Sequence, residues 1–146
     1  MFQPGTVIYF NPFYFKNGAA SKPKYFIVLK EIDDHYILAS LPSSRIFLPH
    51  RVPEVHGCIH IPEGCISCYL FEPGKPICDN GFAFPLLTAI YGEQLDHYEK
   101  ATIAQSYPIA GVDYEIKGQL IPQQLDDLLA CLRNSTVVKR RYRRIL

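Results

Sequence analysis

The chain has 146 residues, of which 48% are hydrophobic and 20% are charged, and its formal net charge at pH 7 is +1. This balance excludes an intrinsically disordered chain, which combines few apolar residues with a high net charge, and the length fits one domain over residues 1–146. Twelve prolines and nine glycines interrupt the sequence and favour short strands and turns over a helical bundle.

Three strands are expected at the start of the chain. The first covers residues 5–10, where TVIYF is β-branched and aromatic throughout, and Asn11-Pro12 is expected to end it. Residues 16–23 (KNGAASKP) have the composition of a loop. Residues 25–30 then form a second strand with a buried run, and residues 36–40 form a third. We expect these three strands to pair in antiparallel order.

The acidic middle of the chain covers residues 52–110. Residues 41–85 contain seven prolines, which break regular structure because each one removes a backbone hydrogen-bond donor. We expect short strands near residues 45–48, 65–71 and 83–91. Residues 93–104 fit either a short helix or irregular structure.

The C-terminal part carries the clearest helix. Residues 115–121 predict a final strand or turn, and a helix follows from Pro122 to a stop at Asn134, with leucines at helical spacing. We expect the leucine face of this helix to close one side of the sheet. The tail KRRYRRIL, residues 139–146, is strongly basic and fits either contact with an RNA backbone or a solvated end.

The small net charge conceals three blocks of different sign. Residues 1–51 carry six basic and three acidic side chains, residues 52–118 carry three and nine, and residues 119–146 carry six and two. If the two basic ends meet in space, they form a basic face that suits nucleic acid. Scattered, solvated charge is the alternative.

The cysteines and the N-terminal sequence bear on location. The five cysteines are odd in number, MFQPGTVIYF has no basic leader, and no stretch approaches the ~20 apolar residues that span a bilayer. We therefore expect a cytoplasmic protein with no membrane partner, with free thiols rather than disulfides.

In their order along the chain, PGTVIYF, the lysine-bearing loop, KYFIVL, YILASLPSS and GQLIPQQLDDLLACLRNS resemble the MazF/PemK-type toxins of bacterial type II toxin–antitoxin systems. The match covers residues 4–45 and 116–135. The resemblance implies a mainly β (α+β) fold, a small SH3-like barrel with a C-terminal helix packed on the sheet. It further implies a homodimer, an antitoxin partner, and a metal-independent endoribonuclease without cofactor that cleaves single-stranded mRNA. The chain departs from the family pattern at Lys24-Tyr25, where Arg-Pro is usual, and in the longer acidic middle.

The resemblance also implies catalytic residues. Metal-independent cleavage lets the RNA 2′-hydroxyl attack the neighbouring phosphate, which requires groups that take a proton, give a proton and stabilise negative charge. The family's arginine maps to Lys24, its hydroxyl maps to Ser43 or Ser44, and Arg45 is placed to supply the guanidinium that position 24 lacks. A solvated loop lysine and a turn serine are the alternative.

The loop between the first two strands gives a second signal. Basic and aromatic residues are interleaved there, which suits single-stranded RNA because phosphates need cations and unstacked bases need flat faces. The candidate RNA-binding residues are Phe13, Tyr14, Phe15, Lys16, Lys22, His50 and Arg51. In the alternative interpretation, alternate members of FYF pack inward and the lysines keep the loop soluble. His35 and His97, like His50, are able to act as acid or base near neutrality, but none of the three lies in a recognisable catalytic spacing.

A rival constellation suggests zinc. HGCIH places His56, Cys58 and His60 on one face of a strand, and CISC adds Cys65 and Cys68. A second pair at matching spacing is missing, and apolar strands often bury thiols, so the leading interpretation contains no metal.

Two alternatives to a ribonuclease therefore remain. One is a non-catalytic barrel comparable to the CcdB-type toxins, which act by contact with a topoisomerase, and the other is a zinc-stabilised interaction module. Replacing Lys24 by alanine separates the first of these from a ribonuclease, because only the ribonuclease should lose its activity.

Overall fold

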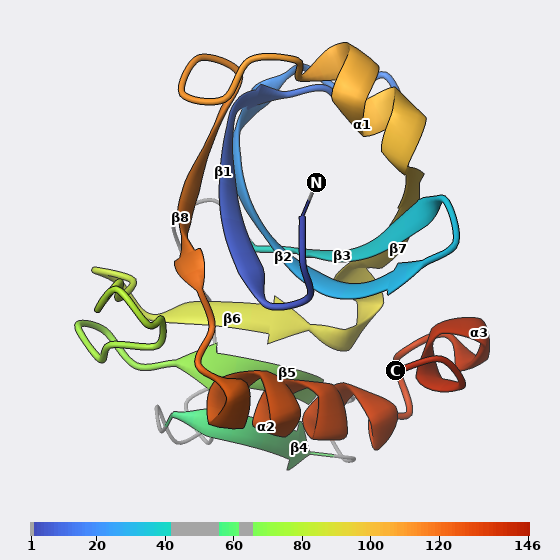
Figure 1. Ribbon diagram of the computed structural model, residues 1–146. Helices are drawn as coiled ribbons and strands as arrows, with labels where there is room; N and C mark the ends of the chain where they lie inside the picture. The colour runs from blue at the N-terminus through green and yellow to red at the C-terminus, as the bar shows by residue number, and fades with distance from the viewer. Residues whose placement is uncertain (1, 42–55, 62–65) are drawn as a thin grey trace.

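The computed structural model describes residues 2–41, 56–61 and 66–146. The chain is mainly β, with two antiparallel sheets (Figure 1). The larger sheet, in the order β7-β3-β2-β1-β8, contains β1 (Thr6–Phe13), β2 (Lys22–Ile32), β3 (His35–Ser40), β7 (Leu95–Glu99) and β8 (Tyr114–Gln119). The smaller sheet contains β4 (Gly57–Ile61), β5 (Ile66–Phe71) and β6 (Thr88–Tyr91), in that order. The helices are α1 (Lys100–Ser106), α2 (Pro122–Arg133) and α3 (Arg140–Arg143), with a 3-10 turn at Gly92–Gln94.

The expected antiparallel pairing of the first three strands is confirmed, since β2 pairs with both β1 and β3. The expected end of the first strand at Asn11-Pro12 is wrong, because β1 continues to Phe13. A register shift between Phe10 and Phe13 absorbs the proline, which has no N–H to donate to the ladder.

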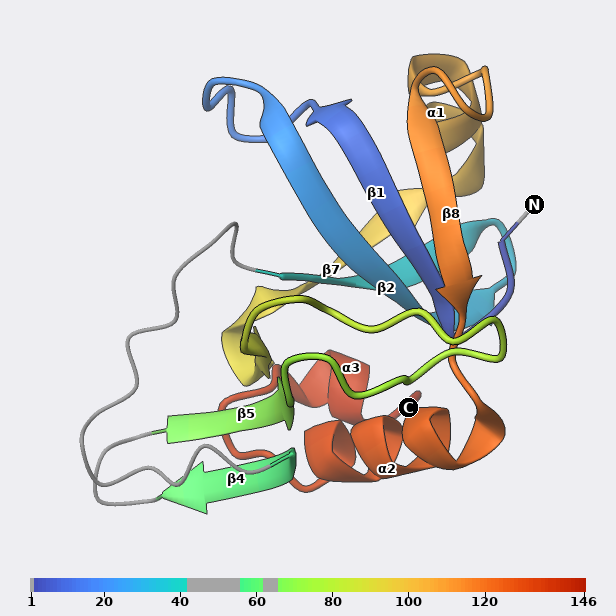
Figure 2. The ribbon, with the colours of Figure 1, turned by 90° about the vertical axis from the view of Figure 1, so that its left-hand side faces the viewer.

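Side chains alternate between two cores along the central strands. In β2, Phe26 and Val28 face one cluster of buried residues, whereas Ile27 and Leu29 face the other. Successive side chains of a strand point to opposite faces, so a sheet covered on both sides needs a continuous apolar run such as YFIVL. One cluster lies under α1, and the other lies between the larger sheet, the smaller sheet and α2 (Figure 2).

The segment 93–104 shows where the sequence was ambiguous. It forms neither one helix nor irregular structure, but strand β7 followed by helix α1. Strand β7 pairs with β3 alone and is one edge of the larger sheet, and β8 is the other edge. The ladders of the described residues therefore do not close into the expected barrel.

The expected short strands have mixed outcomes. The strands predicted near residues 65–71 and 115–121 correspond to β5 and β8, although residue 65 itself is not described. Only Thr88–Tyr91 of the segment 83–91 is a strand, and residues 45–48 lie outside the described part of the chain.

Helix α2 agrees with its prediction, with Pro122 in the first turn and Asn134 at the C-cap. It buries Leu128, Cys131 and Leu132 and contacts β4 and β5 of the smaller sheet (Figure 1), and these three side chains belong to the core cluster that also includes residues of the larger sheet. Within residues 2–41, 56–61 and 66–146, no helix has the length and apolar character needed to cross a membrane.

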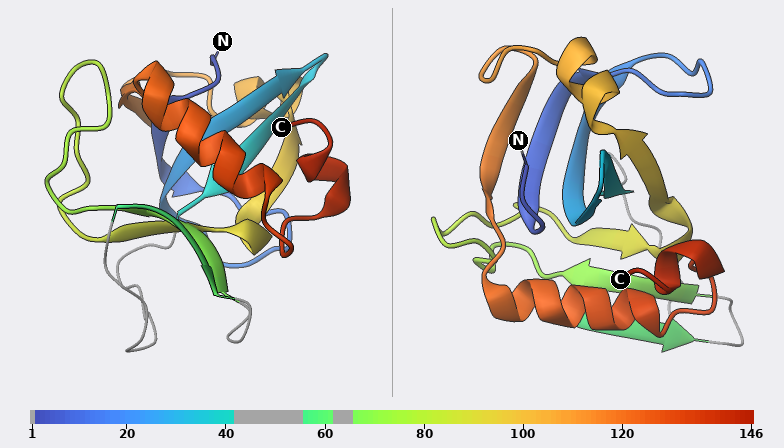
Figure 3. Two further views of the ribbon diagram at one scale, coloured as in Figure 1. Left: turned by 90° about the horizontal axis from the view of Figure 1, so that it is seen from below. Right: turned by 45° about the vertical axis from the view of Figure 1, so that its right-hand side comes forward.

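Two further expectations are corrected. Cys58 and Cys131 form a disulfide, so the cysteines are not all free thiols, whereas Cys68 and Cys78 are free and buried. The basic tail is not simply a solvated end, because α3 buries Tyr142, which is 3% exposed. Figure 3 shows α3 beside the end of β7 that is remote from α1.

Candidate functional site

A cavity of about 230 Å³ opens at the free edge of β7. Three segments meet there: the loop that follows β1, the start of β3, and helix α1. Its wall includes the side chains of Tyr14, Lys16, His35, His97, Tyr98 and Tyr107.

Two histidines come together in this cavity through strand pairing. In the antiparallel register of β3 and β7, His35 lies opposite Glu99 and Ile37 lies opposite His97. His35 and His97 are therefore diagonal neighbours on one face of the sheet. Their ring centroids are 6.0 Å apart.

The ring of His97 has a defined orientation. Its Nδ1 lies 2.9 Å from the hydroxyl oxygen of Tyr142 and 3.4 Å from Oδ1 of Asp96. The Tyr142 hydroxyl in turn donates to Asp96 Oδ1, at 3.3 Å, so its oxygen is left to accept from His97. The proton of a neutral His97 therefore belongs on Nδ1, and Nε2 carries the lone pair.

The ring of His35 is also oriented through its Nδ1, in this case by a carboxylate. Its Nδ1 lies 2.8 Å from Oδ1 of Asp34, the residue before it. A carboxylate accepts but does not donate, so Nδ1 carries the proton here as well and Nε2 is free. Among the described residues, no hydrogen bond engages Nε2 of either histidine.

Lys16 brings a positive charge to the same edge. Its ammonium group lies 3.3 Å from Asp96 Oδ2 and 4.1 Å from the centre of the Tyr98 ring, and it donates to the backbone carbonyl of His97. Partial burial alone would raise the pKa of Asp96, but the His97 backbone N–H and the Lys16 ammonium outweigh it and hold that pKa below its ordinary value. Lys16 is therefore fixed beside β7 as a charged group.

Tyr14 forms an exposed aromatic surface at the cavity. Its side chain is 58% exposed, and its ring stacks on Tyr107 with centroids 5.8 Å apart and planes 21° from parallel. The backbone N–H of Tyr14 also donates to the Tyr107 hydroxyl, at 2.8 Å. The free face of Tyr14 is available for stacking by a flat ligand.

The structure places the predicted site residues in different environments. Phe13 is 1% exposed and packs in the core, although it also borders the cavity, and its contact with RNA stays a prediction. Lys22 and Lys24 lie over the ring of Phe15, each 5.9 Å from its centre, outside the wall of the cavity. Burial, with a smaller effect of Lys22, lowers the pKa of Lys24.

Four predicted residues, Ser44, Arg45, His50 and Arg51, lie outside the described part of the chain, as does the zinc candidate Cys65. Of the other zinc candidates, Cys58 and His60 group with Cys131, which the sequence interpretation did not include. His56 instead forms a hydrogen bond with Gln124. Cys68 is buried, and this burial, with a smaller effect of the Glu93 charge, raises the pKa of its thiol to about 11.

The sequence did not predict this cavity, because its two histidines belong to separate segments and one of these segments was not predicted to be a strand. The chain matches no known family model, no curated protein and no solved structure.

Proposed function

We propose that this protein is an endoribonuclease that cleaves single-stranded RNA at the cavity beside β7. The observation that carries the proposal is the pair of histidines, His35 and His97, whose rings lie 6.0 Å apart. Nδ1 of His35 bonds to Asp34, Nδ1 of His97 bonds to the Tyr142 hydroxyl, and no described residue bonds to either Nε2. Cleavage by the RNA's own 2′-hydroxyl needs an acid and a base side by side, and histidine serves as either near neutral pH.

The chemistry proceeds by transesterification. Nε2 of the neutral histidine takes the proton of the 2′-hydroxyl, whose oxygen attacks the adjacent phosphorus. The bond from phosphorus to the 5′-oxygen breaks, and the protonated histidine gives that oxygen its proton. The products are a 2′,3′-cyclic phosphate and a 5′-hydroxyl. Lys16 supplies positive charge for the extra negative charge on the phosphorus oxygens in the transition state.

Substrate binding would use the aromatic and basic residues next to the histidines. Tyr14 offers a stacking face for an unpaired base, and the lysines around Phe15, Lys22 and Lys24, extend a basic surface along the same loop. A single strand suits this arrangement because its bases are free to turn outward.

At the level of family, we propose a MazF/PemK-like toxin with an SH3-like arrangement. Its support is the order of the elements, with three consecutive antiparallel strands at the start and a strand followed by a leucine-rich helix near the end. A cytoplasmic homodimer neutralised by an antitoxin belongs to the same proposal. Ser44 and Arg45 remain predicted site residues within it.

The test uses the purified full chain and a fluorogenic single-stranded RNA, with products identified by mass spectrometry. His35→Ala and His97→Ala are each expected to lower kcat about 10²- to 10⁴-fold. His56→Gln, a histidine of the smaller sheet region, is the matched control and should retain full activity. Unchanged cleavage in both alanine variants, or no cleavage by the wild type, would remove the proposal.

A protein-binding toxin comparable to CcdB is the second candidate, favoured by one observation. Ile109, Val112 and Ile116 are all more than half exposed, and they lie in or just before the edge strand β8. Expression of the chain in a bacterial host separates the two functions. Growth arrest with fragmented mRNA supports the ribonuclease, whereas arrest with intact mRNA supports protein binding.

A further inference from the structure

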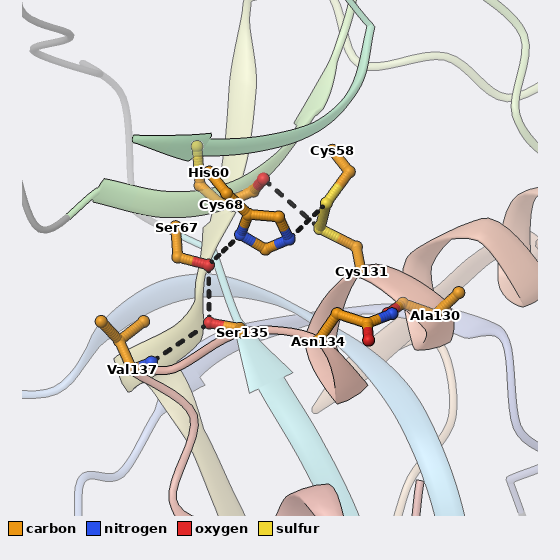
Figure 4. The surroundings of a disulfide bond; sticks show 9 residues. All are labelled: Cys58, His60, Ser67, Cys68, Ala130, Cys131, Asn134, Ser135 and Val137. Carbon is orange, nitrogen blue, oxygen red and sulfur yellow. Dashed lines mark hydrogen bonds between the residues drawn. A yellow bond between two sulfur atoms is a disulfide. The ribbon is translucent and has the colours of Figure 1, made fainter. Parts of the chain in front are cut away.

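A second cluster of reactive side chains lies where α2 meets the smaller sheet (Figure 4), and none of its residues lines the cavity beside β7. Cys58 of β4 and Cys131 of α2 form the disulfide, and Nε2 of His60 lies 3.0 Å from Cys58 Sγ. The two sulfur atoms and this nitrogen all lie within 4.8 Å of one another. Cys131 is 4% exposed, whereas Cys58 and His60 are exposed to solvent.

The orientation of His60 is fixed from behind by two serines. Its Nδ1 lies 2.7 Å from Ser67 Oγ, and the Ser67 hydroxyl donates to Ser135 Oγ, at 2.6 Å. Since the Ser67 hydrogen is used in that bond, Ser67 accepts from His60 Nδ1–H, and the lone pair of Nε2 faces the sulfur. Ser67 and Ser135 are 6% and 1% exposed, so this support is built into the core.

Such a histidine has the form of a metal ligand. Histidines that bind metals generally donate the second ring N–H to a fixed partner, which sets the tautomer and the ring plane. Two cysteines and one histidine are also a known ligand set for zinc, with a fourth position left for water or another group. In the structure, the bond between the two sulfurs prevents them from binding a metal as thiolates.

We propose that reduction of the Cys58–Cys131 disulfide creates a site for one zinc ion, held by the two thiolates and His60 Nε2. A dithiol supplies two electrons and two protons and becomes a disulfide, or a phosphine does so with water and becomes a phosphine oxide; the S–S bond breaks and two thiols form. Zinc then displaces the two thiol protons, while the neutral imidazole binds through its lone pair. A disulfide oxidant such as oxidised glutathione then takes up the two electrons and two protons and becomes two thiols, while the Cys58–Cys131 bond forms again and the ion is released.

The geometry requires a small movement. Around a tetrahedral zinc with Zn–S bonds of about 2.3 Å, two sulfurs lie roughly 3.8 Å apart, so the pair has to separate from bonding contact. Strand β4 is an edge strand that pairs only with β5, so Cys58 can move outward without breaking a second ladder. A cavity of about 460 Å³ borders Cys58, His60 and Cys131, which leaves space for a fourth ligand such as water or Asp127.

The disulfide-bonded state and the zinc-bound state have the same structural effect. Each links helix α2 to strand β4, in one case by a covalent bond and in the other by an ion. This site shares no residue with the cavity beside β7, so it does not depend on the proposed ribonuclease activity.

The test titrates the full chain with Co²⁺, a spectroscopic substitute for zinc, with and without prior reduction by a phosphine and without oxygen. The reduced wild type is expected to bind one equivalent with thiolate-to-cobalt charge-transfer absorption, and the oxidised protein to bind none. Zinc should displace the cobalt. The proposal is overturned if the reduced protein shows no such absorption, or if the oxidised protein shows it equally.

Variants identify the ligands. Cys58→Ser alters an exposed residue, so the fold should persist by circular dichroism while the absorption is lost. Ser67→Ala should weaken cobalt binding about ten- to a hundredfold by releasing His60. Cys78→Ala removes a thiol elsewhere and is the matched control, which should bind normally. Unchanged binding in Cys58→Ser, or loss of binding in Cys78→Ala, would place the ion elsewhere.

Discussion

His35 and His97 lie diagonally across the pair β3 and β7, with their rings 6.0 Å apart. The separation follows from the register, because diagonal neighbours of an antiparallel pair stand on one face within reach of long or aromatic side chains. Both imidazole rings therefore stand on the same face of the sheet. This relationship leads to the first prediction.

An RNA with a sulfur in place of the bridging 5′-oxygen identifies the acid. A thiolate leaves without needing a proton, so the substitution of the acid histidine by alanine should cost little with this substrate. The substitution of the base histidine should cost the full 10²- to 10⁴-fold with either substrate. The measurement is kcat for both variants on the two RNAs. Equal rescue of both variants would contradict the division of roles between His35 and His97.

Lys16 and Lys24 should differ in the kinetic constant that they affect. Lys16→Ala is expected to lower kcat about 10²- to 10³-fold, as when one group that stabilises an oxyanion is removed. Lys24→Ala should raise KM and leave kcat nearly unchanged, because Lys24 lies outside the cavity wall. Steady-state kinetics at low salt measures both. An equal fall in kcat for the two variants would instead place Lys24 at the reacting phosphate.

Asp96 should make the stability of the protein depend on acid pH. The pKa of Asp96 in the folded state lies below the ordinary 3.8. The stabilisation that its carboxylate gives to the fold is therefore fully present above pH 3.8 and is lost as the pH falls through the lower folded pKa. Asp96→Asn should reduce the free energy of unfolding at neutral pH by at most about 1 kcal/mol, since the side chain is 43% exposed and water screens its ion pairs.

Urea unfolding of the wild type and Asp96→Asn, from neutral to strongly acid pH, measures this difference. The gap between the two proteins should shrink as the pH falls. A gap that stays constant down to the lowest pH would show that the carboxylate charge does not stabilise the fold.

The buried thiols should resist alkylation. Burial, followed by a nearby carboxylate in each case, raises the pKa of Cys68 to about 11 and that of Cys78 to about 12. At pH 8 a thiol of pKa near 11 is ionised in only about one molecule in a thousand, and the thiolate is the reactive form.

Iodoacetamide should therefore leave Cys68 and Cys78 unmodified in the native protein and modify the exposed Cys58 only after reduction. Peptide mass spectrometry gives the extent of modification at each position, and the unfolded protein serves as the control in which every thiol reacts. Modification of Cys68 as fast as that of reduced Cys58 would contradict the burial that the fold implies.

The elements that the sequence predicted well are those whose pattern is local. The apolar run of β2 and the leucine spacing of α2 depend on neighbours a few residues away, and both elements were located. Strand β7 was missed because LDHYE buries only Leu95 completely and has too few apolar residues to show a period.

The candidate site depended on distant partners and was harder to predict. The proximity of His35 and His97 requires the β3–β7 register, which no local pattern encodes. Tyr142 was hidden in a run of arginines that predicted only charge. Cys58 and Cys131 meet because α2 packs against β4. No local pattern predicts this packing, and the sequence therefore led us to expect free thiols.

The disulfide also decides which parts of the fold a protease can separate. It joins residues 73 positions apart, and the closed ring contains β7 and β8, the two edge strands of the larger sheet, whereas the central strands β1 to β3 lie outside it. A cut in the exposed segment 72–76 would open this ring without dividing the molecule, and the two pieces would part only in a reductant. The two edge strands thus belong to one covalent ring, whereas strand pairing and side-chain packing, such as that of Tyr114 against Phe10, attach them to the centre of the sheet.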